Sequence, residues 1–440
     1  MAVSATSLVQ HETSRFRRFL LYSMFIVLMI DNMPGMGIGF ALGLSAKNLY
    51  LYALIVFIAI RAVTKPSGVR FVDLDVHVPY LLLLMYATLT WALLSIADPT
   101  YGVVRGAITI KNQILDLYLF MFAFRYGVEN REDYLWLYRA IIVTMFVSSF
   151  VTIIDYLNIP DLGIVGSHQG RIEGPIGAAN QYGALLAFLI PVSIAAMPSN
   201  MSSMGRFAWN AGIVTSSVLL IASGSRGAFV SVFVGSFLGV IYLRRFLDMR
   251  RVVRFASISV LVLIVLMIGF IAFNPEFVMQ RFDKTTADSV GTASSGRVDI
   301  WRAAVLIMLE WPISFLVGYG WNAYEYSGIW KSAHNEYLDR WFELGIIGVA
   351  LYVYLLYTMV ARVRRRLAEL DDEVRQIMIG YVFGMMMIYV DIFFVAIPDP
   401  WTVIWLMTGL LMGLQATALQ RGGQGNAKTL RRQRLTEAPS

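Results

Sequence analysis

The sequence contains no cysteine in 440 residues and only four histidines. The absence of cysteine excludes structural disulfides, thiolate metal sites and cysteine nucleophiles. No phosphate-binding GxxxxGK loop and no HExxH zinc motif occurs. Charge is also scarce, because Asp, Glu, Lys and Arg make up 15% of the chain, whereas a soluble domain carries nearer a quarter. This low charge content argues against a soluble protein.

Apolar residues are abundant instead, at 58% of the chain with a mean hydropathy of +0.63. Apolar runs of membrane-spanning length recur along almost the whole sequence. Every backbone polar group must be paired internally within hydrocarbon, so the spans are expected to be helices. We predict an all-α polytopic membrane protein, residues 1–440 forming a single integral-membrane domain of about 12 transmembrane helices. The predicted spans are 19–42, 48–63, 78–97, 103–123, 133–157, 179–197, 207–222, 228–243, 255–273, 334–360, 376–396 and 400–419.

Arginine and lysine concentrate in alternate loops, which by the positive-inside rule places those loops and both termini in the cytoplasm. Three arginines precede the first apolar run without a small-residue cleavage site after it, so an uncleaved first helix is expected. Residues 421–440 are predicted to form a disordered basic cytoplasmic tail.

Two outward loops are longer than a connection needs, namely 158–178 and 274–333. We predict that they form a shorter and a large periplasmic loop. The large loop contains a helix-like apolar stretch from Val298 to Val317, with Trp301 and Trp311 as interface anchors. This stretch is expected to lie against the outer membrane surface without crossing it.

Arginines in the outward loops are informative because the positive-inside rule disfavours them there. Arg171, Arg226 and Arg297 each lie in a segment rich in Gly or Ser. A guanidinium is always protonated and binds phosphate through two parallel hydrogen bonds. The glycines around Arg226 also allow close backbone approach and a helix start that favours an anion. Interfacial snorkelling explains one such arginine well, but the three together predict a site for an anionic ligand.

His334 lies where a polar segment meets an apolar run. A lone histidine is more often a satisfied polar residue than a catalyst, but neutral imidazole is a ready general base near pH 7. A helix beginning at Ala333 would place His334, Gly345 and Gly348 on one stripe, the glycines allowing a neighbouring helix to pack closely. The sequence therefore predicts a base at the outer end of a tightly packed helix.

The segment Asp73-Leu-Asp75-Val-His77 resembles the Asp-x-Asp metal motif of nucleotide-sugar glycosyltransferases. It falls on the predicted cytoplasmic side, away from the three arginines. Two carboxylates in so short a pattern are weak evidence for a metal site. A solvated loop is the preferred interpretation, and no metal is expected.

A resemblance to a known family rests on several segments. His334-Asn335, nine residues and then Gly345-x-x-Gly348 is similar to the His-[Asn/Ser/Gln]-x9-Gly-x-x-Gly signature of O-antigen ligases, which belong to the wider O-antigen ligase and polymerase family. "RIEGPIGAANQYGA" and "SGSRGA" resemble the Arg-x-x-Gly…Asn and Ser-Arg-Gly stretches of that family. "SGRVDIW" and "GYGWNAY" lie in the large loop, where the family has them. The order and spacing of these segments are more specific than any one of them.

The resemblance implies a type C glycosyltransferase-like fold in the bacterial inner membrane, with a periplasmic active site. It implies O-antigen on undecaprenyl diphosphate as donor, lipid A–core oligosaccharide as acceptor, metal-independent chemistry, no cofactor and no nucleic-acid partner. The carried-over residues are His334 as catalytic base and Arg171, Arg226 and Arg297 as diphosphate ligands. Asn180 and Asn335 are weaker candidates, and the roles of four residues stay open: Arg281, Arg302, Asp391 and Asp399.

Three other functions fit part of the sequence. An O-antigen polymerase would use the same donor chemistry with a second lipid-diphosphate glycan as acceptor. A protein O-glycosyltransferase usually carries more sequence after the histidine. An anion transporter would place charges such as Lys111 and Asp116 at mid-membrane depth and show paired halves, but no internal repeat is evident.

Overall fold

The computed structural model describes residues 39–41, 44–64, 73–98, 100–157, 167–168, 171–250, 296–329 and 333–436, together with residues 19, 22–23, 265, 268–269 and 272. Within these ranges, nine helices are long and apolar enough to cross a membrane. The predicted all-α, polytopic class is thereby confirmed. The figure of about 12 spans stays a prediction, since most of 19–42 and most of 255–273 lie outside the described residues.

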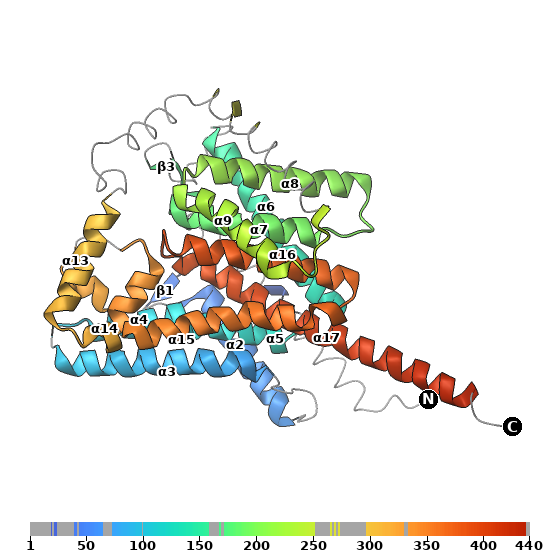
Figure 1. Ribbon diagram of the computed structural model, residues 1–440, viewed down its shortest axis with the longest axis horizontal. Helices are drawn as coiled ribbons and strands as arrows, with labels where there is room; N and C mark the ends of the chain where they lie inside the picture. The colour runs from blue at the N-terminus through green and yellow to red at the C-terminus, as the bar shows by residue number, and fades with distance from the viewer. Residues whose placement is uncertain are drawn as a thin grey trace.

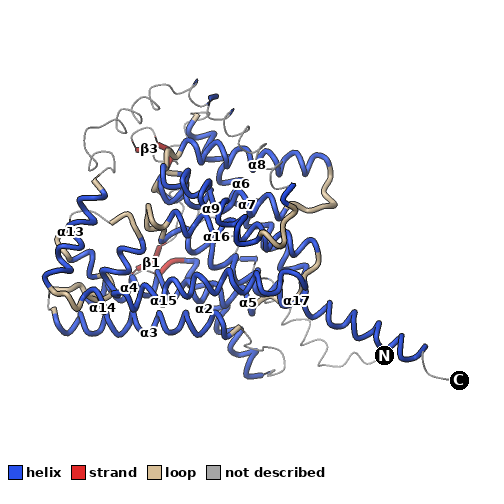
Figure 2. The backbone as a smooth tube through the Cα atoms, in the orientation of Figure 1, coloured by secondary structure: helices blue, strands red, loops and turns tan. Residues whose placement is uncertain are grey.

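The helices follow one another with short connections through most of the chain (Figures 1 and 2). The elements up to the middle of the sequence are β1 (Gly39–Ala41), β2 (Leu44–Ser45), α2 (Ala46–Thr64), α3 (Leu74–Ala97), α4 (Val103–Ile110), the π-helix η1 (Lys111–Leu115), α5 (Asp116–Tyr126), α6 (Arg131–Tyr156), β3 (Ser167–His168), β4 (Arg171–Ile172), the 3-10 helix η2 (Gly174–Ile176), α7 (Ala179–Ala196), α8 (Ser203–Ala222) and α9 (Arg226–Leu243). The later elements are α13 (Arg297–Glu310), α14 (Ser314–Val317), η3 (Ala323–Tyr326), α15 (Glu336–Arg366), η4 (Leu367–Glu369), α16 (Asp372–Asp391) and α17 (Pro398–Thr436).

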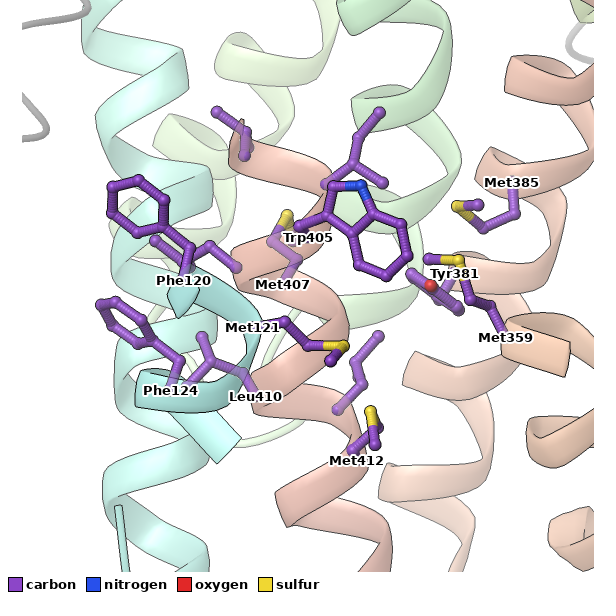
Figure 3. Packing of buried hydrophobic residues seen from close by; sticks show 14 of the residues in the cluster. Phe120, Met121, Phe124, Met359, Tyr381, Met385, Trp405, Met407, Leu410 and Met412 are labelled. Atoms are coloured by element: carbon purple, nitrogen blue, oxygen red, sulfur yellow. The ribbon is translucent and has the colours of Figure 1, made fainter. Parts of the chain in front are cut away.

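Three late helices organise the bundle. Helix α16 packs on α7 and α9, α17 packs on α5 and α6, and α15 packs on α3. Figure 3 shows the side chains of α17, including Met407 and Leu410, beside Phe120, Met121 and Phe124 of α5. Gly409 allows this approach, because a Cβ there would come within 2.2 Å of the Met121 carbonyl oxygen. These contacts fix the relative positions of helices that are far apart in the sequence.

Helix α15 is bent at Gly345, which has φ 62° and ψ −172°. A Cβ at Gly345 would lie 2.2 Å from the Leu316 carbonyl oxygen of α14, so a side chain has no room. Gly348 faces Leu344 of its own helix across the bend. Gly345 thus lies against a neighbouring helix, α14, as predicted, whereas Gly348 does not show such a contact, and the prediction of one continuous helix from Ala333 is wrong. The left-handed conformation of Gly345 breaks it, and the helix begins at Glu336.

The apolar stretch from Val298 to Val317 is helical, as the sequence indicates, but it is divided into α13 and α14 around Trp311-Pro312. Proline disfavours a helical conformation in the residue before it, which explains the break. In Figure 1, α13 and α14 lie at the opposite end of the bundle from the projecting end of α17. The helix corrects the prediction of disorder for residues 421–436, which belong to α17, while residues 437–440 lie outside the described residues. Residues 421–436 contain no proline, and their Leu, Arg, Gln and Lys residues favour helix.

Candidate active site

Arg171 joins two parts of the site. It begins β4, and its Nε donates a hydrogen bond to the carbonyl oxygen of Ser223 at a distance of 2.8 Å. Its Nη2 donates to the side-chain oxygen of Asn180 in the first turn of α7. Asn180, a weaker candidate from the sequence, is thus a direct partner of this guanidinium. One bond connects β4 to the turn between α8 and α9, and the other connects it to the start of α7.

That turn is the Ser-Gly-Ser-Arg-Gly segment. Gly224 has φ 57°, a conformation that favours glycine, and the Ser225 side chain caps α9 by accepting from the Ala228 N–H at 3.3 Å. Arg226 is the first residue of α9 and is exposed. A helix N-terminus carries unpaired N–H groups and partial positive charge, so Arg226 and the start of α9 attract an anion together.

Arg297 occupies the same position on another helix. It is the first residue of α13 and follows Gly296, which has φ 79°. Burial lowers the pKa of Arg297, the nearby Arg226 lowers it further, and Asp391 opposes both effects. The guanidinium stays protonated at neutral pH despite this shift. Arg226 and Arg297 are therefore close enough to repel, and an anion between them would relieve the repulsion.

Asp391 places a carboxyl group beside Arg297 and the first turn of α9. It ends α16 and is fully buried. Neither carboxylate oxygen has a hydrogen-bond partner among the described residues. A Cβ on Gly227 would lie 3.0 Å from Asp391 Oδ1, so the carboxylate lies against the first turn of α9. The sequence left the role of Asp391 open, and the structure places it with the arginines.

His334 lies just before α15 and has φ 50°, in the left-handed region. This conformation is uncommon for a residue with a side chain and is found preferentially at functional sites. The preceding Ala333 carbonyl accepts a 2.8 Å hydrogen bond from Trp301 Nε1 of α13. Asn335 then caps α15, its side chain accepting from the Leu338 N–H at 3.1 Å. The Asn of the family signature thus has a structural role that fixes the direction of the chain at His334.

The contacts around the four predicted residues are continuous. Arg171 is bonded to the turn that presents Arg226, and Arg226 interacts electrostatically with Arg297. One turn after Arg297, Trp301 holds the residue before His334. The loop after Asp391 also reaches this segment, because the Glu336 N–H donates to the Ile392 carbonyl oxygen at 2.8 Å. These contacts connect the segments of all four sequence-predicted residues, and α13, which carries Arg297, lies at the end of the bundle opposite the projecting end of α17 (Figure 1).

Residues 211–353 match the family model described as O-Antigen ligase. The predicted resemblance is confirmed over this segment, which contains Arg226, Arg297, His334 and both signature glycines. Arg171 and Asn180 lie before it. A search of the curated proteins finds no match. The match indicates a membrane enzyme of the O-antigen ligase or polymerase kind, acting on polysaccharide and lipid-linked substrates.

A cavity of about 480 Å³ lies beside the first turns of α15, the helix that follows His334. Its volume is within the range of roughly 300–1,000 Å³ that small-molecule sites usually have. One face of the first part of α15 lines it with Glu336, Asp339, Arg340 and Glu343. Six aromatic side chains complete much of the wall: Tyr80, Trp321, Tyr324, Tyr352, Trp401 and Trp405.

This cavity was not predicted from the sequence. The signal for it is the spacing of Glu336, Asp339 and Glu343, which puts three acids on one face at the start of a largely apolar helix. Glu336 is a structural residue, since it accepts from Tyr352 Oη at 2.8 Å and Trp401 Nε1 at 3.0 Å. Arg340 is also engaged, bonded to Glu343 and stacked on the ring of Trp321 at 4.3 Å.

The remaining open residues fall in different places. Arg302 is exposed on α13, and Asp399 lines a second cavity of about 660 Å³ with Asn48, Asn112 and Asp116. Lys111 and Asp116 are paired with each other at 2.7 Å. Arg281 lies outside the described residues. Among the described residues no cluster of three or more His, Cys, Asp or Glu side chains could hold a metal.

Asp73 and its neighbours are not the solvated loop that the sequence indicated. Asp73 is fully buried and pairs with both Arg125 and Arg362, while His77 is bonded to the Tyr126 hydroxyl at 2.9 Å. These contacts connect α3, α5 and α15. Charged partners from two other helices, which the sequence pattern does not show, account for the burial.

Proposed function

We propose that this protein is an O-antigen ligase of the bacterial inner membrane, with both termini in the cytoplasm and the active site at the periplasmic face. It transfers O-antigen polysaccharide from undecaprenyl diphosphate to a sugar of lipid A–core oligosaccharide. The observation that carries the proposal is the continuous set of contacts joining Arg171, Arg226 and Arg297 to the segment of His334. The family match over 211–353 supports the same class of chemistry.

The reaction is a single inverting displacement. A hydroxyl oxygen of the acceptor sugar attacks the anomeric carbon of the donor sugar as His334 accepts the hydroxyl proton. A new C–O bond forms, the bond between the anomeric carbon and the phosphate oxygen breaks, and its electron pair leaves with undecaprenyl diphosphate. A positioned base of this kind typically supplies about 10²–10⁴-fold in rate.

The arginines bind the diphosphate and stabilise the charge that develops as it leaves. Fixed cations aimed at developing charge often make the largest single contribution to catalysis. Arg226 and Arg297 begin two helices, so their positions are set by α9 and α13 rather than by flexible loops. This placement supports a metal-independent reaction in which guanidinium groups take the part that a cation plays in other transferases.

Transfer by purified protein in lipid tests the proposal. The donor is O-antigen on undecaprenyl diphosphate, the acceptor is lipid A–core, and excess chelator is present. Ligated lipopolysaccharide should form without any ion gradient and with the anomeric configuration inverted. Failure to ligate under these conditions, or retention of configuration, would contradict the proposal. Transfer without a gradient would also exclude an anion transporter as the source of the activity.

O-antigen polymerase is the second candidate, because the same family match accommodates it. The two functions differ in the acceptor and can be separated in a deletion strain. Loss of a ligase leaves long chains that are not attached to lipid A–core. Loss of a polymerase leaves lipid A–core that carries a single repeat unit.

A further inference from the structure

The cavity beside His334 contains two polar atoms that the fold leaves unused. Tyr324 is 7% exposed, and its hydroxyl is buried with no hydrogen-bond partner among the described residues. Asp339 Oδ1 is likewise buried without a partner in the described part of the chain. Both residues line the cavity, and they lie close enough to interact electrostatically. A buried unpaired donor or acceptor costs free energy, so such a pair is expected to serve a ligand.

The charged residues that line the cavity indicate which class of ligand it accepts. Four acids line it, Glu325, Glu336, Asp339 and Glu343, but only one cation, Arg340. Arg340 is already bonded to Glu343 and Gln113. A phosphate or a carboxylate meets no unengaged cation among the lining residues, unlike at the arginines on α9 and α13, because Arg340 is engaged and the nearby Arg105 pairs with Glu325. An uncharged molecule with hydroxyl groups needs no such cation, since carboxyl groups and phenols exchange hydrogen bonds with hydroxyls.

The aromatic wall narrows the class further. Trp321, Trp401 and Trp405 present large apolar surfaces next to these polar atoms. A sugar ring has the matching character, because its C–H faces are apolar and its edge carries hydroxyls. Pockets that combine aromatic walls with a few convergent polar groups are typical ligand sites. Glu325 is exposed and also lines the cavity, so the space reaches the surface.

The segment of His334 lies between the cavity and the helix that carries Arg297, so the acceptor and the donor of the proposed reaction can be assigned to different sides of it. The backbone of Ala333 lies next to the Asp339 carboxyl group, and the carbonyl of Ala333 accepts a hydrogen bond from Trp301 on the helix that carries Arg297. The residue before the histidine is thus held between the cavity wall and the arginine-bearing helix. A base that deprotonates the acceptor during attack on the donor must lie between them.

On the basis of the proposed ligase function, we propose that this cavity is the acceptor subsite and binds an uncharged sugar of lipid A–core through Tyr324 Oη and Asp339 Oδ1. The subsite would reject phosphorylated or acidic sugars at this position. The diphosphate-linked donor would bind at the arginines.

Steady-state transfer with purified protein in lipid tests the subsite, using O-antigen on undecaprenyl diphosphate and purified lipid A–core. Tyr324→Phe and Asp339→Asn should each raise the KM for lipid A–core by about threefold to tenfold, and leave the KM for the donor within about twofold. Tyr326→Phe is the matched control, because Tyr326 lies in the same short helix, does not line the cavity and should behave as wild type.

A rise in donor KM alone, or no change in either KM, would overturn the acceptor assignment. Asp339→Asn also alters the contact to Ala333, so Tyr324→Phe is the cleaner variant. If a melting experiment shows that Tyr324→Phe is not folded at the assay temperature, a binding experiment with wild type replaces it. Lipid A–core then binds in competition with either a dephosphorylated or a phosphorylated core oligosaccharide. The unphosphorylated form should compete better. Absence of transfer by wild type would contradict the ligase proposal itself, whereas transfer with unchanged variant KM values would contradict only the subsite.

Discussion

Arg226 and Arg297 begin two different helices, yet they lie close enough that the positive charge of Arg226 disfavours the charged form of Arg297. Burial of Arg297 adds to this cost, because removal of a charge from water is unfavourable. Asp391 opposes part of it, although its carboxyl oxygens make no hydrogen bond within the described residues. The diphosphate of the proposed donor would offset the remaining cost, because it carries more than one negative charge.

Arg297→Gln should lower kcat/KM for the donor by about 100-fold or more, because one fixed cation is removed from the developing charge. Arg302→Gln is the matched control, being an exposed arginine of the same helix, and should change the value by less than about threefold. Steady-state transfer at varied donor concentration measures both. Equal losses in the two variants would mean that general positive charge on α13, and not Arg297 itself, binds the donor.

At the scale of elements, two residues of the His-Asn-x9-Gly-x-x-Gly signature, Asn335 and Gly345, determine the start and the bend of α15. The Asn after the histidine caps α15, and the glycine after nine further residues bends the same helix. The bend turns the first part of α15 so that Glu336 reaches Tyr352 and Trp401. The spacing of the signature is thus a requirement of the helix start that carries His334.

Gly345→Ala should destabilise the protein by more than about 2 kcal/mol, since the left-handed conformation costs roughly 1–2 kcal/mol and the new Cβ would also clash with Leu316. Gly177→Ala separates these effects, because Gly177 has φ 69° but nothing within 4 Å of an added Cβ. Thermal unfolding in detergent should show the larger loss for Gly345→Ala. Similar losses would assign the whole effect to backbone strain.

Asp73 connects three helices through its ion pairs with Arg125 and Arg362. Burial alone would raise the pKa of Asp73, but the two guanidinium groups hold it below its ordinary value. A lowered folded-state pKa contributes stability above the unfolded-state pKa of about 4, and that contribution is lost as the pH falls through the folded-state value.

Asp73→Asn should therefore destabilise the protein by roughly 3–5 kcal/mol at pH 7, because buried guanidinium groups lose their partner. The difference from wild type should shrink as the pH falls below about 4. Asp75→Asn is the control, since Asp75 is 39% exposed and should cost less than about 1 kcal/mol. Melting curves across this pH range measure the three proteins, and a difference independent of pH would exclude ionised Asp73 as the cause.

At the scale of the whole molecule, the sequence predicted the all-α membrane class and the positions of most described spans, because membrane helices leave a direct composition signal. Span 207–222, for example, is helix α8, although α8 is not among the nine helices that meet the length and hydropathy criteria. The bend at Gly345, the burial of Asp73 and the cavity around Asp339 were missed. Each depends on partners from distant helices, which no local pattern records.

The predicted orientation can be tested on the cysteine-free chain with single introduced thiols. Asp299→Cys on α13 should react with a membrane-impermeant maleimide in intact spheroplasts, because its end of the bundle is proposed to be periplasmic. Asp372→Cys is the matched control, since the Asp372 side chain is 89% exposed at the start of α16 and should react only after lysis. The opposite pattern would invert the topology and place the site in the cytoplasm.

The account as a whole depends on His334 acting as a base next to a separately bound diphosphate. The most direct measurement compares wild type and His334→Ala in one lipid preparation, with donor binding and transfer recorded on the same samples. Donor affinity should stay within about threefold while turnover falls by about 10²–10⁴-fold. Ligation by His334→Ala at the wild-type rate, with the donor bound normally, would contradict the central claim.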